Sequence, residues 1–345
     1  MNQKLQAVIT ETEKAVIGKR NTLLWVLLAM LAGGHILLED IPGVGKTTMA
    51  LAFCRAMHLE YGRVQFTPDV LPSDITGYSL YQKETGRLEY QPGAILCNLF
   101  LADELNRATS RTQSALLEAM EEGQVTVDGI SHPLPRPFCV IATQNPTGAA
   151  GTQRLPDSQI DRFMIRLSLG YPRPADEAEM LLRHREGRPL DRVGRIMTGD
   201  DLCRMQAECA AVYLSRDIAD YIVALITATR NSPDLSRGAS PRATLGVMAM
   251  AQAHAYLSDR DYVVPTDVRS VFVTTVAHRL ILTPEAEHAG KTTADAANEL
   301  LLAVPAPSAA SAYSSGTAGS GTAGERTSSG NQFLRRRDNA DTLRS

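Results

Sequence analysis

The chain has 345 residues, of which 44% are hydrophobic and 21% are charged, and its formal net charge is -3. This length suits two domains plus a tail, and this composition excludes disorder over most of the chain. The small net charge excludes a general attraction to nucleic acid or anionic membranes, so binding to either would require a local basic patch.

The most apolar segment, residues 23–38, is too short to span a membrane. It contains sixteen residues and is interrupted by Gly33, Gly34 and His35, whereas a spanning helix needs about 20 residues. We predict a buried helix that ends at the two glycines, followed by a strand over 35–38. The N-terminal residues lack a signal-peptide pattern. The five cysteines include no Cys-x-x-Cys pair, which indicates buried free thiols and a reducing cytoplasm.

Five short apolar runs predict the strands of a parallel sheet. They lie at 35–38, 63–66, 98–102, 138–142 and 164–169. Nearly continuous apolar strands of this kind occur in parallel sheets that are covered on both faces. We therefore expect an α/β domain over residues 1–172.

Beyond residue 172 the apolar residues recur every three or four positions, which predicts helices. This pattern indicates a helical domain over residues 173–303. From residue 304 the composition shifts to Ser, Ala, Gly and Thr, with a tandem SGTAG repeat. Such a segment, here 304–345, is typical of a disordered tail. The arginine run Arg335–Arg337 near its end fits a solvated charge run better than a docking motif.

The segment after the first predicted strand, EDIPGVGKTTMA, has the composition of a phosphate-binding loop. Its glycines let backbone N–H groups face a phosphate, and the start of the next helix adds positive potential. Lys46 is expected to reach the β- and γ-phosphates of ATP, and Thr47 to hold Mg²⁺. Asp40 departs from the pattern G-x-x-x-x-G-K-[ST], which has a glycine at that position.

Two further predicted strands end in polar side chains. Asp103 and Glu104 follow one strand, and ligands bind at the carboxyl ends of strands in open α/β sheets. We expect Asp103 to hold the water shell of the metal ion and Glu104 to orient the attacking water. Asn145 follows the next strand, and its amide can contact the γ-phosphate and the water. A helix cap at Asp103 and Glu104 and an Asn-Pro turn at Asn145 are the alternatives, which the combination with Lys46 disfavours.

Several motifs resemble those of the MoxR family of AAA+ ATPases and occur in the same order. The longest is LFLADELNRATSRTQSALLEAMEEGQVTVDG at 99–129, and others are LEDIPGVGKTT at 38–48, ATQNP at 142–146 and GASPRATL at 238–245. The resemblance covers about residues 5–300. It implies an AAA+ fold, in which a five-stranded parallel sheet domain is followed by a small all-helical lid domain.

The resemblance also implies roles for individual residues. Val16, Ile17 and Gly18 would line the adenine pocket, and the phosphate loop would comprise Gly43, Val44, Gly45, Lys46, Thr47 and Thr48. Asp103 and Glu104 would be the Walker B pair, Asn145 the sensor 1 residue, Arg242 the sensor 2 arginine, and Arg162 the arginine supplied across the subunit boundary. The residues themselves support Arg242, because Pro241 at a helix start places it in the first turn, where its guanidinium can clamp a phosphate. For Arg162 a solvated charge is the alternative.

Residues 77–93 and 122–134 have the pattern of two hairpins. In the second, Val125 and Val127 alternate with polar residues before an Asp128-Gly129 turn. In the family, hairpins at these places face the ring pore or a client protein. Exposed hairpins without a binding role are the alternative.

The resemblance implies an ATPase that works as a ring oligomer, expected to be a hexamer. Such a machine would remodel client proteins, mature them or insert cofactors into them, beside a partner with a von Willebrand A domain. A DNA-remodelling or helicase-like motor and a magnesium-chelatase-like subunit are alternatives, but the chain lacks a basic groove with aromatic residues. A nucleotide switch without turnover is another alternative, which the intact catalytic set disfavours. The histidines show no metal-ligand spacing, so no metal besides nucleotide-bound Mg²⁺ is expected.

Overall fold

The computed structural model describes residues 2–41, 43–84, 86–145 and 154–307. A five-stranded parallel sheet with the order β2-β5-β8-β1-β9 lies at its centre. The strands are β1 (Ile36–Glu39), β2 (Tyr61–Gln65), β5 (Leu99–Asp103), β8 (Cys139–Gln144) and β9 (Ile165–Leu167). Each overlaps one of the five apolar runs, so the prediction of a parallel α/β sheet is confirmed.

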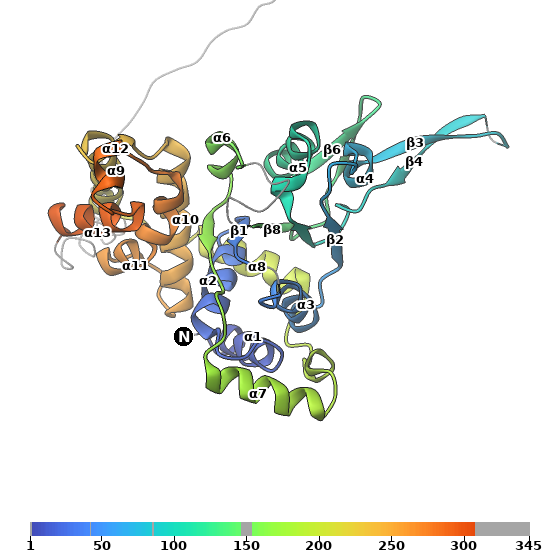
Figure 1. Ribbon diagram of the computed structural model, residues 1–345, viewed down its shortest axis with the longest axis horizontal. Coiled ribbons are helices and arrows are strands. Elements are labelled where there is room, and N and C mark those ends of the chain that lie inside the picture. Colours follow the sequence, from blue (N-terminus) through green and yellow to red (C-terminus); the bar gives the residue numbers. More distant parts are fainter. Residues whose placement is uncertain (1, 42, 85, 146–153, 308–345) are drawn as a thin grey trace, which may run out of the picture.

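Helices cover both faces of the sheet (Figure 1). One face packs against α1 (Gln3–Glu13), α2 (Arg20–Leu31) and α3 (Lys46–Met57), and the other packs against α4 (Pro72–Thr76) and α5 (Ser110–Glu122). Side chains alternate along each strand. In β1, Leu38 therefore joins the core beside α1–α3, whereas Leu37 joins the core beside α5.

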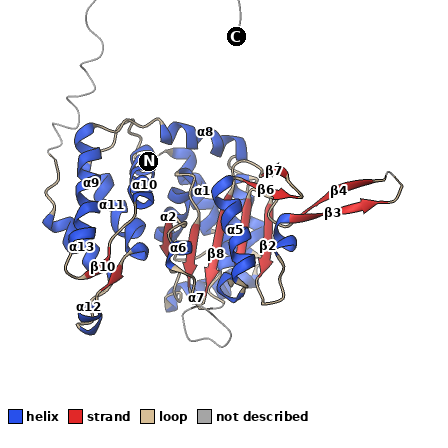
Figure 2. Cartoon of the chain, turned by 90° about the horizontal axis from the view of Figure 1, so that it is seen from above, coloured by secondary structure: helices blue, strands red, loops and turns tan. Residues whose placement is uncertain are grey.

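Two antiparallel hairpins extend this domain. The first is formed by β3 (Gly77–Gln82) and β4 (Arg87–Pro92), and the second by β6 (Gln124–Val127) and β7 (Ile130–Pro133). The β3–β4 hairpin projects away from the body of the protein (Figures 1 and 2). A Cβ atom at Gly93 would lie 2.1 Å from the Ile75 carbonyl oxygen, so a glycine is required where the chain leaves the hairpin. Both predicted hairpins are confirmed.

The chain after the sheet is mostly helical. It contains α7 (Pro174–Arg185), α8 (Gly199–Ala210), α9 (Arg216–Asn231), α10 (Pro241–Leu257), α11 (Pro265–Val276), α12 (Pro284–His288) and α13 (Thr293–Ala303). Short helical segments are η2 (Pro189–Arg192) and η3 (Ala277–Arg279) in this region, and η1 (Leu105–Arg107) and α6 (Asp157–Ile160) within the sheet domain. An antiparallel ribbon of β10 (Leu235–Arg237) and β11 (Ile281–Leu282) interrupts the helices. Helical periodicity did not predict this ribbon, so the lid is helical except at these few residues.

The helical region packs directly on the sheet domain. Leu27 of α2, Val247 of α10 and Val271 of α11 belong to one continuous hydrophobic core. A domain boundary at residue 173 therefore remains a prediction. In the described part of the chain, no helix is both long and apolar enough to cross a membrane. Of the predicted tail over 304–345, residues 308–345, which include the arginine run at 335–337, lie outside the described residues.

The core on the α5 side of the sheet generates a stability prediction. Phe100 of β5 is fully buried there, so Phe100→Ala should destabilise the protein by about 3–5 kcal/mol, because it leaves a cavity. Leu302→Ala is the control, since that side chain is 79% exposed and its loss should cost less than about 0.5 kcal/mol. Urea unfolding measures both. Equal unfolding midpoints for the two variants would contradict this description of the core.

Candidate functional site

The phosphate loop joins β1 to α3. Gly43 and Gly45 have φ angles of 86° and 95°, in the left-handed region that favours glycine. Gly45 is the N-cap, so α3 begins at Lys46. The first N–H groups of a helix have no partner within the helix, and together with the helix dipole they stabilise an anion. This geometry suits a phosphate group.

The ammonium group of Lys46 lies inside this loop. The residue is 7% exposed, and its Nζ donates to the Asp40 carbonyl oxygen at 3.0 Å. Burial lowers the pKa of Lys46, and the carboxylates of Asp103, Asp40 and Glu104 oppose part of this shift. Lys46 therefore lies within electrostatic range of the two carboxylates with which it is expected to act.

Asp40, which departs from the usual loop pattern, has a structural role. Its side chain is buried and accepts hydrogen bonds from Ser168 Oγ (2.7 Å), the Leu169 N–H (2.6 Å) and the Gly170 N–H (2.9 Å). A glycine could not make these bonds. Lys19 Nζ donates to the Tyr171 carbonyl oxygen at 2.8 Å and also to the Leu169 carbonyl oxygen. Asp40 and Lys19 thus fix the segment that leads from β9 toward α7.

Asp103 and Glu104 lie at the carboxyl end of β5, where Thr143 of the neighbouring β8 connects them. Thr143 Oγ1 donates to Asp103 Oδ1 at 2.7 Å and accepts from the Glu104 N–H at 2.8 Å. Arg63 of β2 donates to the other Asp103 oxygen at 2.7 Å. Glu104 has a φ angle of 56°, which is uncommon for a residue other than glycine and occurs often at functional sites.

Two side chains hold the Glu104 carboxylate. Arg107 Nη1 donates to Oε2 at 2.7 Å, and Asn145 Nδ2 donates to Oε1 at 3.3 Å. The hydrogen bond from Arg107 lowers the pKa of Glu104, so the carboxylate is ionised at neutral pH. An ionised carboxylate in this position can accept a hydrogen bond from a water molecule and polarise it.

A cavity of about 260 Å³ lies beside the phosphate loop. Its lining residues come from the loop after α1, the phosphate loop, the segment after β9, and α7: Ala15, Val16, Ile17, Lys19, Gly43, Val44, Gly45, Thr48, Tyr171, Pro172, Glu177, Met180 and His184. Gly18 has a φ angle of 70°, and a Cβ atom there would lie 2.3 Å from the Asp176 carboxylate. The cavity has the mixed apolar and polar wall that suits a nucleoside.

Together, these groups fit a magnesium nucleotide at the carboxyl edge of the sheet. The start of α3 and Lys46 suit phosphate groups. Thr47, in the first turn of α3, and Asp103 offer the oxygen ligands that Mg²⁺ prefers. The buried Asn145 Oδ1 has no hydrogen-bond partner in the part of the chain that the structure describes, so it is free to bind a ligand or a water molecule.

Arg162 lies at the opposite, amino edge of the sheet. It precedes β9, whose first residue, Ile165, pairs with Ile36, the first residue of β1. The phosphate loop follows the last residue of β1 instead. The four residues of β1 therefore separate Arg162 from the phosphate loop of its own chain, by about 13 Å at 3.3 Å per residue.

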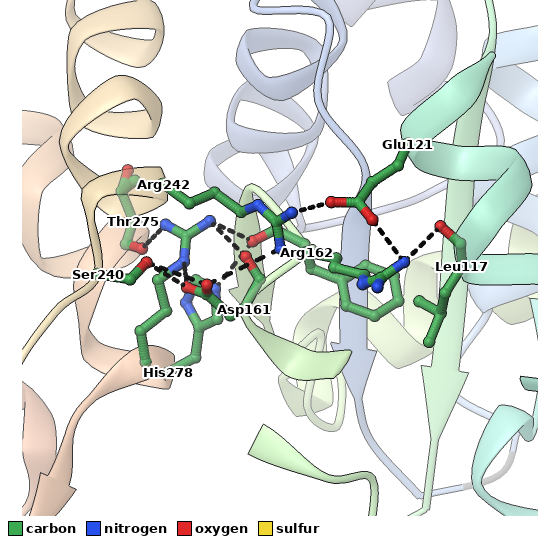
Figure 3. Close-up of polar contacts among 10 residues, drawn as sticks. Leu117, Glu121, Asp161, Arg162, Ser240, Arg242, Thr275 and His278 are labelled. Carbon is green, nitrogen blue, oxygen red and sulfur yellow. Dashed lines mark hydrogen bonds and ion pairs between the residues drawn. The ribbon is translucent and has the colours of Figure 1, made fainter. Parts of the chain in front are cut away.

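Arg242, in the first turn of α10, lies beside Arg162 at the amino edge (Figure 3). Arg162 Nη1 is 2.7 Å from Glu121 Oε2, and Arg242 Nη2 pairs with Glu121 Oε1. Glu121 is near the end of α5, and the Met120 carbonyl oxygen is 3.1 Å from His35 Nε2, just before β1. The structure thus gathers Lys46, Asp103, Glu104 and Asn145 at one edge, and Arg162 and Arg242 at the other.

Sequence reasoning missed four residues that shape these two groups. Asp40 stands out in the sequence only as a departure from a motif, and no motif assigns a role to Arg107, Thr143 or Glu121. The sequence holds a signal for two of them. Arg107 follows Glu104 by three residues within a turn, and Thr143 is at the tip of a predicted strand. The sequence holds no signal for Glu121, because Arg162 and Arg242 are distant from it in the chain.

The Asp40 contacts generate a second stability prediction. In Asp40→Asn an amide NH₂ would replace one acceptor oxygen and face a backbone N–H donor, so the variant should lose about 1–3 kcal/mol of stability. Asp220→Asn is a matched control, because Asp220 pairs with Arg216 on the surface and such pairs contribute about 0–1 kcal/mol. Urea unfolding of the two variants compares them. A loss no larger in Asp40→Asn than in the control would show that Asp40 does not hold this segment.

Comparisons with known proteins agree with this geometry. Residues 35–165 match the profile of the ATPase family associated with various cellular activities (AAA), and residues 227–300 match the AAA lid domain. A crystal structure of a candidate ATPase from Cytophaga hutchinsonii superposes with a TM-score of 0.82 at 37% identity, covering 88% of this chain and 95% of that one.

Relatives with curated names are similar over most of their length. The chain is 43% identical to the uncharacterized protein YeaC of Bacillus subtilis, over 88% of this chain and 95% of the relative. It is 38% identical to the chaperone MoxR1 of Mycobacterium tuberculosis, over 82% and 77%. It is 31% identical to the protein MoxR of Methylorubrum extorquens, over 86% and 93%. The chain therefore belongs to the MoxR family of AAA+ ATPases.

Proposed function

We propose that this chain binds ATP with Mg²⁺ at the carboxyl edge of its sheet and hydrolyses it within a ring of identical subunits. One observation carries the proposal: the cations expected to act in hydrolysis are divided between two opposite edges of the sheet. Lys46 is at one edge, and Arg162 and Arg242 are at the other. A complete site would then form where the amino edge of one subunit meets the carboxyl edge of the next, as in a closed ring, which we propose to be a hexamer.

Each residue at the carboxyl edge has a proposed task. Lys46 and the N–H groups of α3 would bind the phosphates, and Val16, Ile17 and Gly18 would border the base. Thr47 and Asp103 would hold Mg²⁺, which when bound neutralises charge on the phosphates. Glu104, ionised and held by Asn145 and Arg107, would orient a water molecule for attack. Arg162 and Arg242 of the next subunit would stabilise the charge that develops in the transition state.

We propose that the energy of hydrolysis remodels or matures client proteins, together with a partner carrying a von Willebrand A domain. A relative named as a chaperone supports this proposal. The β3–β4 hairpin also supports it, because Tyr81 and Leu88 lie opposite each other and are 59% and 64% exposed. Exposed apolar pairs of this kind suit contact with another protein. The free cysteines fit the proposed cytoplasmic location.

Binding and hydrolysis should separate in two variants. Lys46→Ala should abolish ATP binding, because it removes a cation that contacts the ground state. Glu104→Gln should bind ATP normally and hydrolyse it at least about 100-fold more slowly, because Glu104 acts only in the chemical step. Calorimetry and a phosphate-release assay measure the two properties. Near wild-type turnover in Glu104→Gln would remove Glu104 from the mechanism.

The division of the site predicts complementation between inactive variants. Arg162→Ala should lower hydrolysis by about 10³-fold or more and affect ATP affinity much less, as for other arginine fingers. Lys46→Ala and Arg162→Ala are each inactive alone, but a mixed ring contains interfaces where an intact Lys46 faces an intact Arg162. Mixing the two proteins should therefore restore activity. Co-purification of two different tags confirms that mixed rings form. Mixed rings without recovered activity would mean that Arg162 does not act across the interface.

A further inference from the structure

Glu121 lies between the two arginines at the amino edge (Figure 3). One carboxylate oxygen is 2.7 Å from Arg162 Nη1, and the other pairs with Arg242 Nη2. Glu121 belongs to α5 of the sheet domain, whereas Arg242 belongs to α10 of the lid. The side chains of Arg162, Arg242 and Glu121 are 30%, 42% and 36% exposed, so an incoming anion can reach them.

We infer that Glu121 is an internal counter-ion, which both arginines exchange for the nucleotide phosphates of the neighbouring subunit. This inference rests on the proposed function, because it requires Arg162 to face that nucleotide. The phosphates of ATP carry more negative charge and more acceptor oxygens than one carboxylate, and guanidinium groups bind them with two parallel hydrogen bonds. The exchange is therefore favourable when the neighbour holds ATP, and Glu121 holds the arginines when it does not.

Both arginines retain another anchor when Glu121 releases them. Arg162 Nη1 also donates to the Leu117 carbonyl oxygen at 2.9 Å. Arg242 Nη1 is 3.9 Å from Asp161 Oδ2, and Ser240 Oγ, beside α10, donates to the same Asp161 carboxylate. Glu121 is thus not needed to aim the guanidinium groups. Its main effect is to compete with phosphate for them.

A third arginine nearby does not take part in this exchange. Arg279 is 6% exposed and donates to the carbonyl oxygens of Asp161, Phe163 and Thr275. Burial lowers its pKa to about 10, which leaves it charged at neutral pH. Its contacts are all internal, so it fixes Asp161 and the start of β9 while Arg162 and Arg242 stay accessible.

The end of α5 explains why Glu121 holds these cations. The carbonyl groups at a helix C-terminus create a negative potential, and further acidic residues there are unfavourable unless cations compensate. Glu118, Glu121 and Glu122 of α5 line one cavity together with Arg162. The arginines compensate this charge in the single chain. Removing the charge of Glu121 alone should therefore lower the ATP concentration at which a ring becomes active.

Glu121→Gln tests the inference, with Glu118→Gln as the matched control. Glu118 is one turn earlier in the same cavity, and the structure shows no ion pair for it among the described residues. Both variants lose the same charge, but only Glu121→Gln loses ion pairs with Arg162 and Arg242. At a protein concentration where wild-type activity per chain no longer rises, Glu121→Gln should reach half-maximal hydrolysis at about three- to tenfold less ATP. Glu118→Gln should match the wild type. ATP affinity of dilute, unassembled chains should be unchanged in both, because each chain's own pocket is at the other edge.

The outcomes distinguish this inference from the proposed function. An unchanged half-saturating ATP concentration in Glu121→Gln, or the same shift in Glu118→Gln, overturns the exchange. A lower maximal rate with no gain in apparent affinity also overturns it, because Glu121 would then orient the arginines. If wild-type hydrolysis per chain does not depend on protein concentration at all, the proposed function itself fails and the inference fails with it.

Discussion

The direction of the parallel strands separates two groups of charged residues that are expected to act in one reaction. Every strand of the central sheet runs the same way, so the segments that follow strands gather at one edge and those that precede strands gather at the other. Lys46, Glu104 and Asn145 follow strands and Asp103 ends one, whereas Arg162 precedes β9. The four residues of β1 place these two edges about 13 Å apart along the sheet. The proposed composite site between subunits follows directly from this constraint.

Polar contacts organise each edge, and those at the carboxyl edge leave little freedom to the reacting groups. At the carboxyl edge, Thr143 connects Asp103 to the backbone of Glu104, and Asp40 fastens the phosphate loop to the segment after β9. At the amino edge, Asp161 and Glu121 divide three arginines between a buried structural position and two accessible ones. Preorganised groups such as those at the carboxyl edge stabilise charge without the cost of reorientation. The packing of α10 on α2 connects the lid to this arrangement.

The sequence predicted the sheet and both hairpins because apolar runs, strand-end carboxylates and turn residues are local signals. Lys46, Asp103, Glu104 and Asn145 were predicted for the same reason, since each follows a strand in a recognisable motif. Contacts between distant segments were not predictable. The sequence does not show that Arg242, placed in the first turn of α10, would lie beside Arg162, or that Glu121 would join them. The short ribbon of β10 and β11 was missed because two or three residues carry no measurable periodicity.

A structure of the assembled Glu104→Gln variant with ATP and Mg²⁺ tests the central claim most directly, because this variant should hold the nucleotide without consuming it. The measured quantity is the distance from each arginine to the γ-phosphate bound by Lys46. We expect Arg162 of the neighbouring subunit to lie within hydrogen-bond distance of that phosphate, at about 2.7–3.2 Å, while Arg162 of the same chain remains at the far edge. Phosphate contacts made only by residues of the same chain would contradict it.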